Sequence, residues 1–127
     1  MSNVTMTKPK RAKKMLVVED QGETCLLLGL ILSDRKFETD YVNNLLDADE
    51  YLQKNKPSMI LLDNKLPDGF GVDFISYVKK TYPKIKIIMI SGFSTARDVA
   101  MANGADAFLE KPFSMQNVND AIDKVLA

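Results

Sequence analysis

The chain has 127 residues, 46% of them hydrophobic and 27% charged, which suits one globular domain with a buried core. Histidine is absent and cysteine occurs once, which excludes histidine metal sites, Ser-His and Cys-His catalysis, cysteine-bound zinc, an internal disulfide and a phosphohistidine on this chain. No apolar run is long enough to cross a bilayer, so we expect a cytoplasmic protein without membrane contact.

Equal numbers of acidic and basic residues give a net charge of zero, but the charges are unevenly distributed. Residues 1–14 have no acid and no apolar periodicity, and they contain five bases: Lys8, Lys10, Arg11, Lys13 and Lys14. This composition predicts a disordered basic tail, followed by a domain of residues 15–127. With 12 bases against 17 acids, that domain carries a net charge of −5. It lacks the basic face of most nucleic-acid binders, so no direct contact with nucleic acid is expected from it.

After the tail, short apolar runs alternate with amphipathic stretches. In chain order, this pattern predicts a strand at 15–18, a helix at 21–33, a strand at 37–42, a helix at 45–54, a strand at 58–62, a helix at 70–81, a strand at 86–90, a helix at 95–103 ended by Gly104, a strand at 107–109 and a helix at 114–126 capped by Ser114. Strand 37–42 is less apolar than the others and is expected at a sheet edge. Strict alternation predicts a three-layer α/β fold, a parallel sheet covered by helices on both faces.

The first predicted helix contains a long apolar run. Its spacing predicts that Thr24, Leu27, Leu28 and Ile31 face the core. Cys25 lies within the same run and is expected to be a buried structural thiol.

Polar side chains stand where the predicted strands end. Glu19 and Asp20 follow the first strand, Asp63 the third, Ser91 the fourth and Lys111 the fifth. Because ligands of open α/β sheets bind at the carboxyl ends of strands, we expect these residues to converge.

Three carboxylates at one edge repel one another. At about 5 Å, with an effective dielectric constant near 20, each pair costs roughly 3 kcal/mol. The groups must therefore spread apart or hold a cation. Oxygen ligands without histidine or cysteine favour a hard ion, which indicates Mg²⁺ (or Mn²⁺). Asp63 is then placed to act as a carboxylate nucleophile that forms an acyl phosphate, with Lys111 and Ser91 stabilising the phosphoryl group.

Four motifs stand in order at the predicted strand ends: Val17-Val18-Glu19-Asp20, Asp63 to Gly69, Ser91-Gly92 and Lys111-Pro112-Phe113. In these motifs the chain, from about residue 15 to its C-terminus, resembles the receiver domains of bacterial two-component response regulators. The resemblance implies a flavodoxin-like (βα)5 fold with strand order 2-1-3-4-5.

The resemblance also implies a role for each matching position. Asp63 becomes the phosphorylation site and a metal ligand. Asp20 binds Mg²⁺ directly, Glu19 binds it through water, and Lys65 contributes its backbone carbonyl. Ser91 and Phe108 are the switch residues, the first moving toward the phosphoryl group and the second changing rotamer. The Lys111-Pro112 bond is expected to be cis.

The resemblance further implies a partner and an output. A sensor histidine kinase or phosphotransfer protein would supply the phosphoryl group. Phosphorylation would then change the surface formed by helix 95–103, strand 107–109 and the last helix, which an unknown downstream target would recognise. The domain would catalyse only its own phosphorylation and dephosphorylation, as a monomer or weak dimer. It would act alone or as a piece of a longer regulator.

Two features depart from the family pattern or refine it. The segment between Ser91 and Gly104 is shorter than usual, which leaves the mode of output open. Lys65 and Phe93 lie two residues after Asp63 and Ser91, where they would obstruct the hydrolytic water. We therefore expect slow self-dephosphorylation.

Other functions fit the sequence less well. A receiver-like binding module that is never phosphorylated is the main alternative, although such modules usually lack the acids or the lysine that are present here. A flavin or nucleotide binder needs a phosphate cradle after the first strand, where Glu19 and Asp20 would repel phosphate. An aspartate-nucleophile hydrolase would carry an acid at position 65, which is lysine.

Overall fold

The computed structural model describes residues 13–127. Most of the predicted basic tail, residues 1–12, therefore lies outside the described residues. The first strand begins one residue earlier than predicted, because Lys14 already pairs with Glu38 of the next strand.

The predicted alternation of strands and helices is present. In chain order the elements are β1 (Lys14–Val18), α2 (Gly22–Asp34), β2 (Glu38–Val42), α3 (Leu45–Lys54), β3 (Met59–Asp63), β4 (Lys65–Leu66), β5 (Gly69–Phe70), α4 (Gly71–Thr81), β6 (Lys86–Ser91), α5 (Ala96–Ala102), β7 (Ala107–Glu110) and α6 (Met115–Leu126). The short antiparallel pair of β4 and β5 was not predicted as strands; the sequence indicated only a turn there. None of the helices in residues 13–127 is long and apolar enough to span a membrane.

Five parallel strands form the sheet in the order β2-β1-β3-β6-β7. Counted along the chain, this is the order 2-1-3-4-5, and β2 lies at an edge as predicted. The central strand β3 is buried at every position, from Met59 to Asp63, because helices cover both faces of the sheet.

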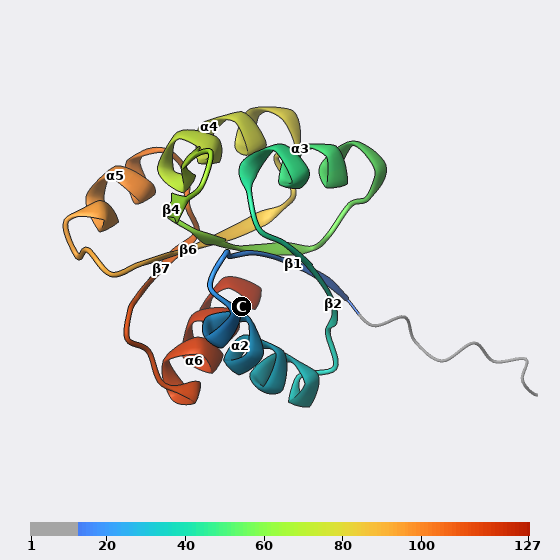
Figure 1. Ribbon diagram of the computed structural model, residues 1–127, viewed down its shortest axis with the longest axis vertical. Helices are drawn as coiled ribbons and strands as arrows, with labels where there is room; N and C mark the ends of the chain where they lie inside the picture. The colour runs from blue at the N-terminus through green and yellow to red at the C-terminus, as the bar shows by residue number, and fades with distance from the viewer. Residues whose placement is uncertain (1–12) are drawn as a thin grey trace, which may run out of the picture.

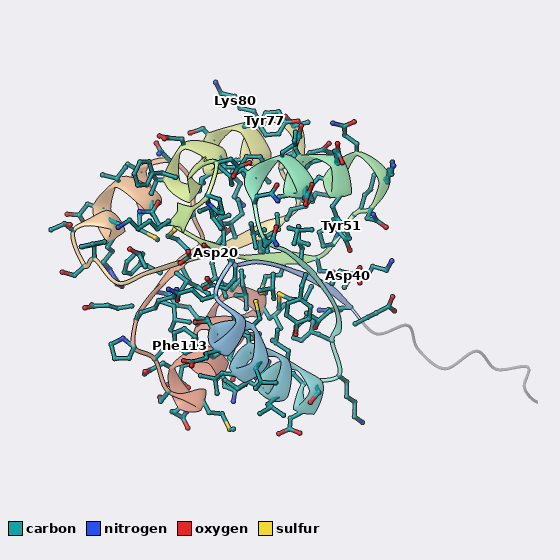
Figure 2. The ribbon with its side chains drawn as sticks, viewed as in Figure 1. Asp20, Asp40, Tyr51, Tyr77, Lys80 and Phe113 are labelled. Carbon is teal, nitrogen blue, oxygen red and sulfur yellow. The ribbon has the colours of Figure 1, made fainter. Side chains whose placement is uncertain are left out.

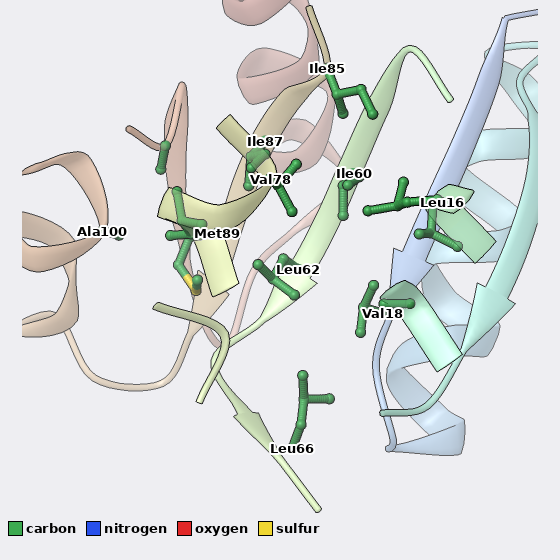
Figure 3. Packing of buried hydrophobic residues seen from close by; sticks show 14 residues of the cluster. Leu16, Val18, Ile60, Leu62, Leu66, Val78, Ile85, Ile87, Met89 and Ala100 are labelled. Carbon is green, nitrogen blue, oxygen red and sulfur yellow. The ribbon is translucent and has the colours of Figure 1, made fainter. Parts of the chain in front are cut away.

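The helices form two layers, α3, α4 and α5 on one side of the sheet and α2 and α6 on the other (Figure 1). Successive strand residues point to opposite faces, so β1 supplies Leu16 and Val18 to one core and Met15 and Val17 to the other. Figure 3 shows the first of these cores, with Ile85 at one end of the sheet and Leu66 beyond the other.

Helix α2 packs on a different stripe from the predicted one. Leu28 and Ile31 are buried as expected, but Leu32 is the third buried residue and Leu27 is 38% exposed. Cys25 is only half-buried, and its thiol donates a hydrogen bond to the carbonyl oxygen of Glu19 at 3.5 Å. The prediction was wrong here because several apolar stripes fit the leucine run, and contact with the sheet and α6 decides among them.

The chain reversals at the ends of α5 and α6 have clear local causes. Gly104 follows α5 with a φ of +109°, a conformation that favours glycine. The Ser114 hydroxyl accepts a hydrogen bond from the backbone N–H of Asn117, and the side-chain oxygen of Asn117 accepts one from the N–H of Ser114, which completes a capping box for α6. Both ends match the sequence-based expectation.

Candidate functional site

The predicted acidic residues meet at the carboxyl edge of the sheet. Strands β1 and β3 are neighbours, so Glu19, just after β1, lies beside Asp63, the last residue of β3. One carboxylate oxygen from each of Glu19, Asp20 and Asp63 lies within 4.8 Å of the others. Glu19 and Asp63 are only 2% and 4% exposed, whereas Asp20 is exposed. Figure 2 shows Asp20 between the two helix layers.

Lys111 bridges the two buried carboxylates. Its Nζ lies 2.9 Å from Oε1 of Glu19 and 3.0 Å from Oδ1 of Asp63. The lysine reaches this position because its backbone N–H donates to the carbonyl oxygen of Ser91, at 2.8 Å, which ties the end of β7 to the end of β6. The peptide bond from Lys111 to Pro112 is cis, as expected.

Burial sets the acidity of this cluster. Desolvation raises the pKa of both Glu19 and Asp63, although their contacts with Lys111 act in the opposite direction. For Lys111, burial lowers the pKa, but its bonds to Glu19 and Asp63 outweigh that effect and raise it overall. The lysine therefore stays charged and offsets part of the repulsion between the acids.

The donor set suits a divalent ion such as Mg²⁺. The ligand atoms are carboxylate oxygens, and Asp20 is exposed, which leaves room for the waters that Mg²⁺ retains. The buried Oε1 of Glu19 faces the ammonium group of Lys111 at 2.9 Å, so the lysine already compensates part of the negative charge in the cluster. The metal-binding roles of Asp20, Glu19, Asp63 and the Lys65 carbonyl remain predictions.

A cleft of about 360 Å³ opens over Asp63. Ser91 lies in its wall, 2% exposed, and its hydroxyl accepts a hydrogen bond from the N–H of Phe93 at 3.1 Å. Across the cleft, Nζ of Lys65 lies 5.8 Å from the centre of the Phe93 ring, within cation–π range. The two residues predicted to obstruct hydrolytic water thus contact each other at the mouth of the site.

Phe108 is half-buried on β7 and packs against the core beneath α3, α4 and α5. The guanidinium carbon of Arg97, from α5, lies 5.6 Å from the centre of its ring. The sequence prediction named Phe108 as a switch residue but did not identify Arg97 as its neighbour. The switching role itself remains a prediction.

Two residues of the site were missed by sequence reasoning. Oε1 of Gln21 accepts a hydrogen bond from Nζ of Lys111 at 3.3 Å, so Gln21 helps to hold the lysine. Gly71 begins α4 directly against the end of β3, where a Cβ would overlap the carbonyl oxygen of Asp63. A polar residue just after Asp20 was a weak signal for the first, whereas nothing in the sequence marked the second.

The hairpin beside Asp63 is fastened to helix α3. The carboxylate of Asp68 accepts hydrogen bonds from the N–H groups of Leu45 at 2.8 Å and Leu46 at 3.0 Å. These bonds lower the pKa of Asp68. Nearer the C-terminal end of α3, the Tyr51 hydroxyl donates a hydrogen bond to the carboxylate of Asp40, on β2, at 2.7 Å (Figure 2). The loop that follows Asp63 is therefore held by a fixed helix.

Comparison with known proteins agrees with this geometry. The family described as response regulator receiver domain matches residues 15–123. The chemotaxis protein CheY of Thermotoga maritima is 30% identical over 116 residues, which cover 89% of this chain and 97% of CheY. The response regulator protein PilR of Pseudomonas aeruginosa is 28% identical over 116 residues, which cover 90% of this chain but only 26% of PilR. This chain thus spans about a quarter of that relative's length.

Solved structures give the same result. The signal receiver domain of a LuxO repressor protein from Vibrio parahaemolyticus superposes with a TM-score of 0.84, at 25% identity, over 91% of both chains. The family match covers most of the chain, and the acids and the lysine converge at the edge of the sheet where receiver domains bind Mg²⁺. The chain therefore belongs to the family of response regulator receiver domains, which signal by phosphorylation in two-component systems.

Proposed function

We propose that Asp63 accepts a phosphoryl group, in a Mg²⁺-dependent reaction, from a phosphohistidine on a partner histidine kinase or phosphotransfer protein. The observation that carries this proposal is the position of the Asp63 carboxylate. It is buried, lies close to the carboxylates of Glu19 and Asp20, and has Nζ of Lys111 at 3.0 Å. A structural acid would not need two further acids beside it at such electrostatic cost.

In the transfer, a carboxylate oxygen of Asp63 attacks phosphorus in line with the bond to the donor imidazole nitrogen. The P–N bond breaks as the acyl phosphate forms, and the imidazole leaves with the electron pair. When bound, Mg²⁺ neutralises charge on the phosphoryl oxygens. Lys111 supplies a second positive charge to the same oxygens, and Glu19 and Gln21 hold its ammonium group in place.

The signal leaves through Ser91 and Phe108. In the unphosphorylated protein the Ser91 hydroxyl is bonded to the N–H of Phe93, and we expect it to turn toward the phosphoryl group. Phe108 would then change rotamer into the space left by that movement. The ring contacts Arg97 of α5, so its movement would alter the surface formed by α5, β7 and α6. Helix α5, in the segment between Ser91 and Gly104, has only seven residues.

The proposal extends to the lifetime of the phosphoryl group. The domain catalyses its own phosphorylation and dephosphorylation and needs no other activity. Lys65 and Phe93 contact each other across the cleft and restrict the approach of water to Asp63. The acyl phosphate should therefore be long-lived.

Phosphorylation with a small donor tests the proposal directly. The protein is incubated with acetyl phosphate and Mg²⁺, and the product is measured by intact mass and phosphate-affinity gels. The expected result is one added phosphoryl group, lost with EDTA and in Asp63→Asn. Asp73→Asn is the matched control, since Asp73 is an exposed acid in the first turn of α4. No modification by acetyl phosphate or by a phosphohistidine donor would support the non-phosphorylated binding module instead.

A further inference from the structure

A basic groove lies at the amino-terminal edge of the sheet, the edge opposite Asp63. It has a volume of about 740 Å³. The residues around it come from the start of β1, the start of β2, the end of α3 and the loop before β3: Lys13, Lys14, Glu38, Lys54, Asn55, Lys56 and Ser58. Backbone bonds fix its floor, because Ser58 and Glu38 donate their N–H groups to the carbonyl oxygens of Lys14 and Lys13.

The lysines of this groove are largely uncompensated. Glu38 is the one acid among the lining residues, and its contact with Lys14 is 3.8 Å long between two exposed side chains. In the part of the chain that the structure describes, Lys13, Lys54 and Lys56 form no ion pair within 4.0 Å. The groove combines Lys13 and Lys14 of the predicted tail with Lys54 and Lys56 of the domain, and its positive charge is local, because acids outnumber bases over residues 13–127 as a whole.

An apolar pocket of about 550 Å³ adjoins the basic groove. Lys56 and Ser58 line both. The rest of the pocket is formed by the turn between α4 and β6 and by the residue before Ser58: Pro57, Thr81, Tyr82, Pro83, Lys84 and Ile85. Figure 3 places Ile85 at this end of the sheet, far from Leu66 at the phosphorylation end. Lysines thus surround an apolar depression that a side chain of a partner could fill.

We propose that this edge binds an acidic peptide segment of a partner protein, with carboxylates on Lys13, Lys54 and Lys56 and one large apolar side chain between Tyr82 and Pro83. Charge complementarity supplies the first half of the match and the adjoining apolar pocket the second. The site goes beyond the phosphoryl transfer at Asp63 and does not depend on it.

An acidic peptide suits this surface better than nucleic acid does. Charges act over about 8 Å at physiological ionic strength, so a short peptide interacts with the groove lysines and little else. A duplex would extend over the rest of a surface on which acids outnumber bases. Phosphates would also leave the apolar pocket unfilled.

Binding of a labelled peptide to the full chain tests this proposal. The probe is a short fluorescein-labelled peptide of Asp and Glu with one central Phe, and binding is followed by fluorescence anisotropy. We expect saturable binding that weakens as salt is raised. Lys56→Glu should weaken it by at least about tenfold, the equivalent of about 1.4 kcal/mol. Tyr82→Ala, or Ser in place of the peptide's Phe, should also weaken it.

Lys124→Glu is the matched control, because Lys124 is an exposed lysine in the last turn of α6, outside both pockets. Binding that Lys124→Glu weakens as much as Lys56→Glu would overturn the proposal, since it would reflect unspecific attraction. So would an absence of binding, or displacement of the peptide by a DNA duplex or by phosphatidylserine vesicles at equal charge. Circular dichroism and phosphorylation by acetyl phosphate, unchanged in Lys56→Glu, show that the variant is folded.

Discussion

The two edges of the sheet carry opposite charge in opposite surroundings. At the carboxyl edge, Glu19 and Asp63 are almost fully buried and share Lys111 within 3.0 Å. At the amino edge, the contact of Lys14 with Glu38 is 3.8 Å long, and the two side chains are 41% and 61% exposed. Buried charges depend strongly on one another, whereas exposed pairs contribute little because water screens them. Substitutions at the first edge should therefore change chemistry and stability, and those at the second only binding.

The largest effect is expected for Lys111→Met. Loss of the ammonium leaves two buried carboxylates facing each other, which should lower the free energy of unfolding by about 3 kcal/mol without added metal. Phosphorylation by acetyl phosphate should slow on the order of 100-fold, the cost of removing one positive group from the transferring phosphoryl. Denaturant titration and initial phosphorylation rates measure the two effects.

The same substitution at the other edge, Lys56→Met, is the control for the comparison. Lys56 is exposed, so its replacement should change the stability by less than about 0.5 kcal/mol and leave phosphorylation unaltered. Equal effects of Lys111→Met and Lys56→Met on stability and phosphorylation would contradict the proposed difference between the two edges of the sheet.

Gly71→Ala should have the next largest effect. The new Cβ would overlap the carbonyl oxygen of Asp63 and lie 3.2 Å from Cα of Asn64, so the backbone must shift. We expect a loss of about 1–3 kcal/mol in the free energy of unfolding, together with slower phosphorylation, because the shift displaces Asp63. Gly22→Ala, where no atom lies within 4 Å of the new Cβ, should cost nothing measurable. Wild-type stability in Gly71→Ala would show that the site is less tightly constrained than proposed.

Sequence pattern predicts one edge of the sheet well. Glu19, Asp20 and Asp63 can be identified because each follows directly on the apolar run of a buried strand, where a charged side chain is unusual. Sheet order then brings β1 and β3 together, and that order came from the family resemblance rather than from the periodicity.

Contacts between distant segments were harder to predict. Gln21 holds Lys111, which lies far along the chain, and Gly71 is needed only because α4 starts against Asp63. The inward stripe of α2, Leu32 in place of Leu27, likewise depends on packing against α6. The basic groove could not be predicted for the same reason, since its lysines come from separate segments within a chain of zero net charge.

The predicted obstruction of hydrolytic water can be tested by the double substitution Lys65→Ser with Phe93→Ser. Both side chains line the cleft over Asp63, and Nζ of Lys65 lies 5.8 Å from the centre of the Phe93 ring. Removing both side chains should speed decay of the acyl phosphate on the order of tenfold, which corresponds to about 1.4 kcal/mol of barrier. Phosphate release after removal of the donor measures the decay. An unchanged rate would mean that water reaches Asp63 by another path.

The smallest effect is expected for Asp68→Asn. The pKa of Asp68 lies below its usual value because the N–H groups of Leu45 and Leu46 bond to its carboxylate at the start of α3. A lowered folded pKa means that Asp68 stabilises the protein above its unfolded pKa of about 3.9 and that this contribution is lost as the pH falls through the lowered folded value. Asparagine keeps only one acceptor oxygen and no charge, so the variant should melt at a lower temperature at pH 7.

That difference in melting temperature should shrink as the pH falls, because protonation takes away the same charge from the parent protein. Glu38→Gln, at the exposed edge, gives the reference for a screened carboxylate and should leave the melting temperature nearly unchanged. A difference for Asp68→Asn that stays constant with pH would assign its effect to the lost hydrogen bond alone. The negative charge of Asp68 would then contribute nothing to holding the loop after Asp63 against α3.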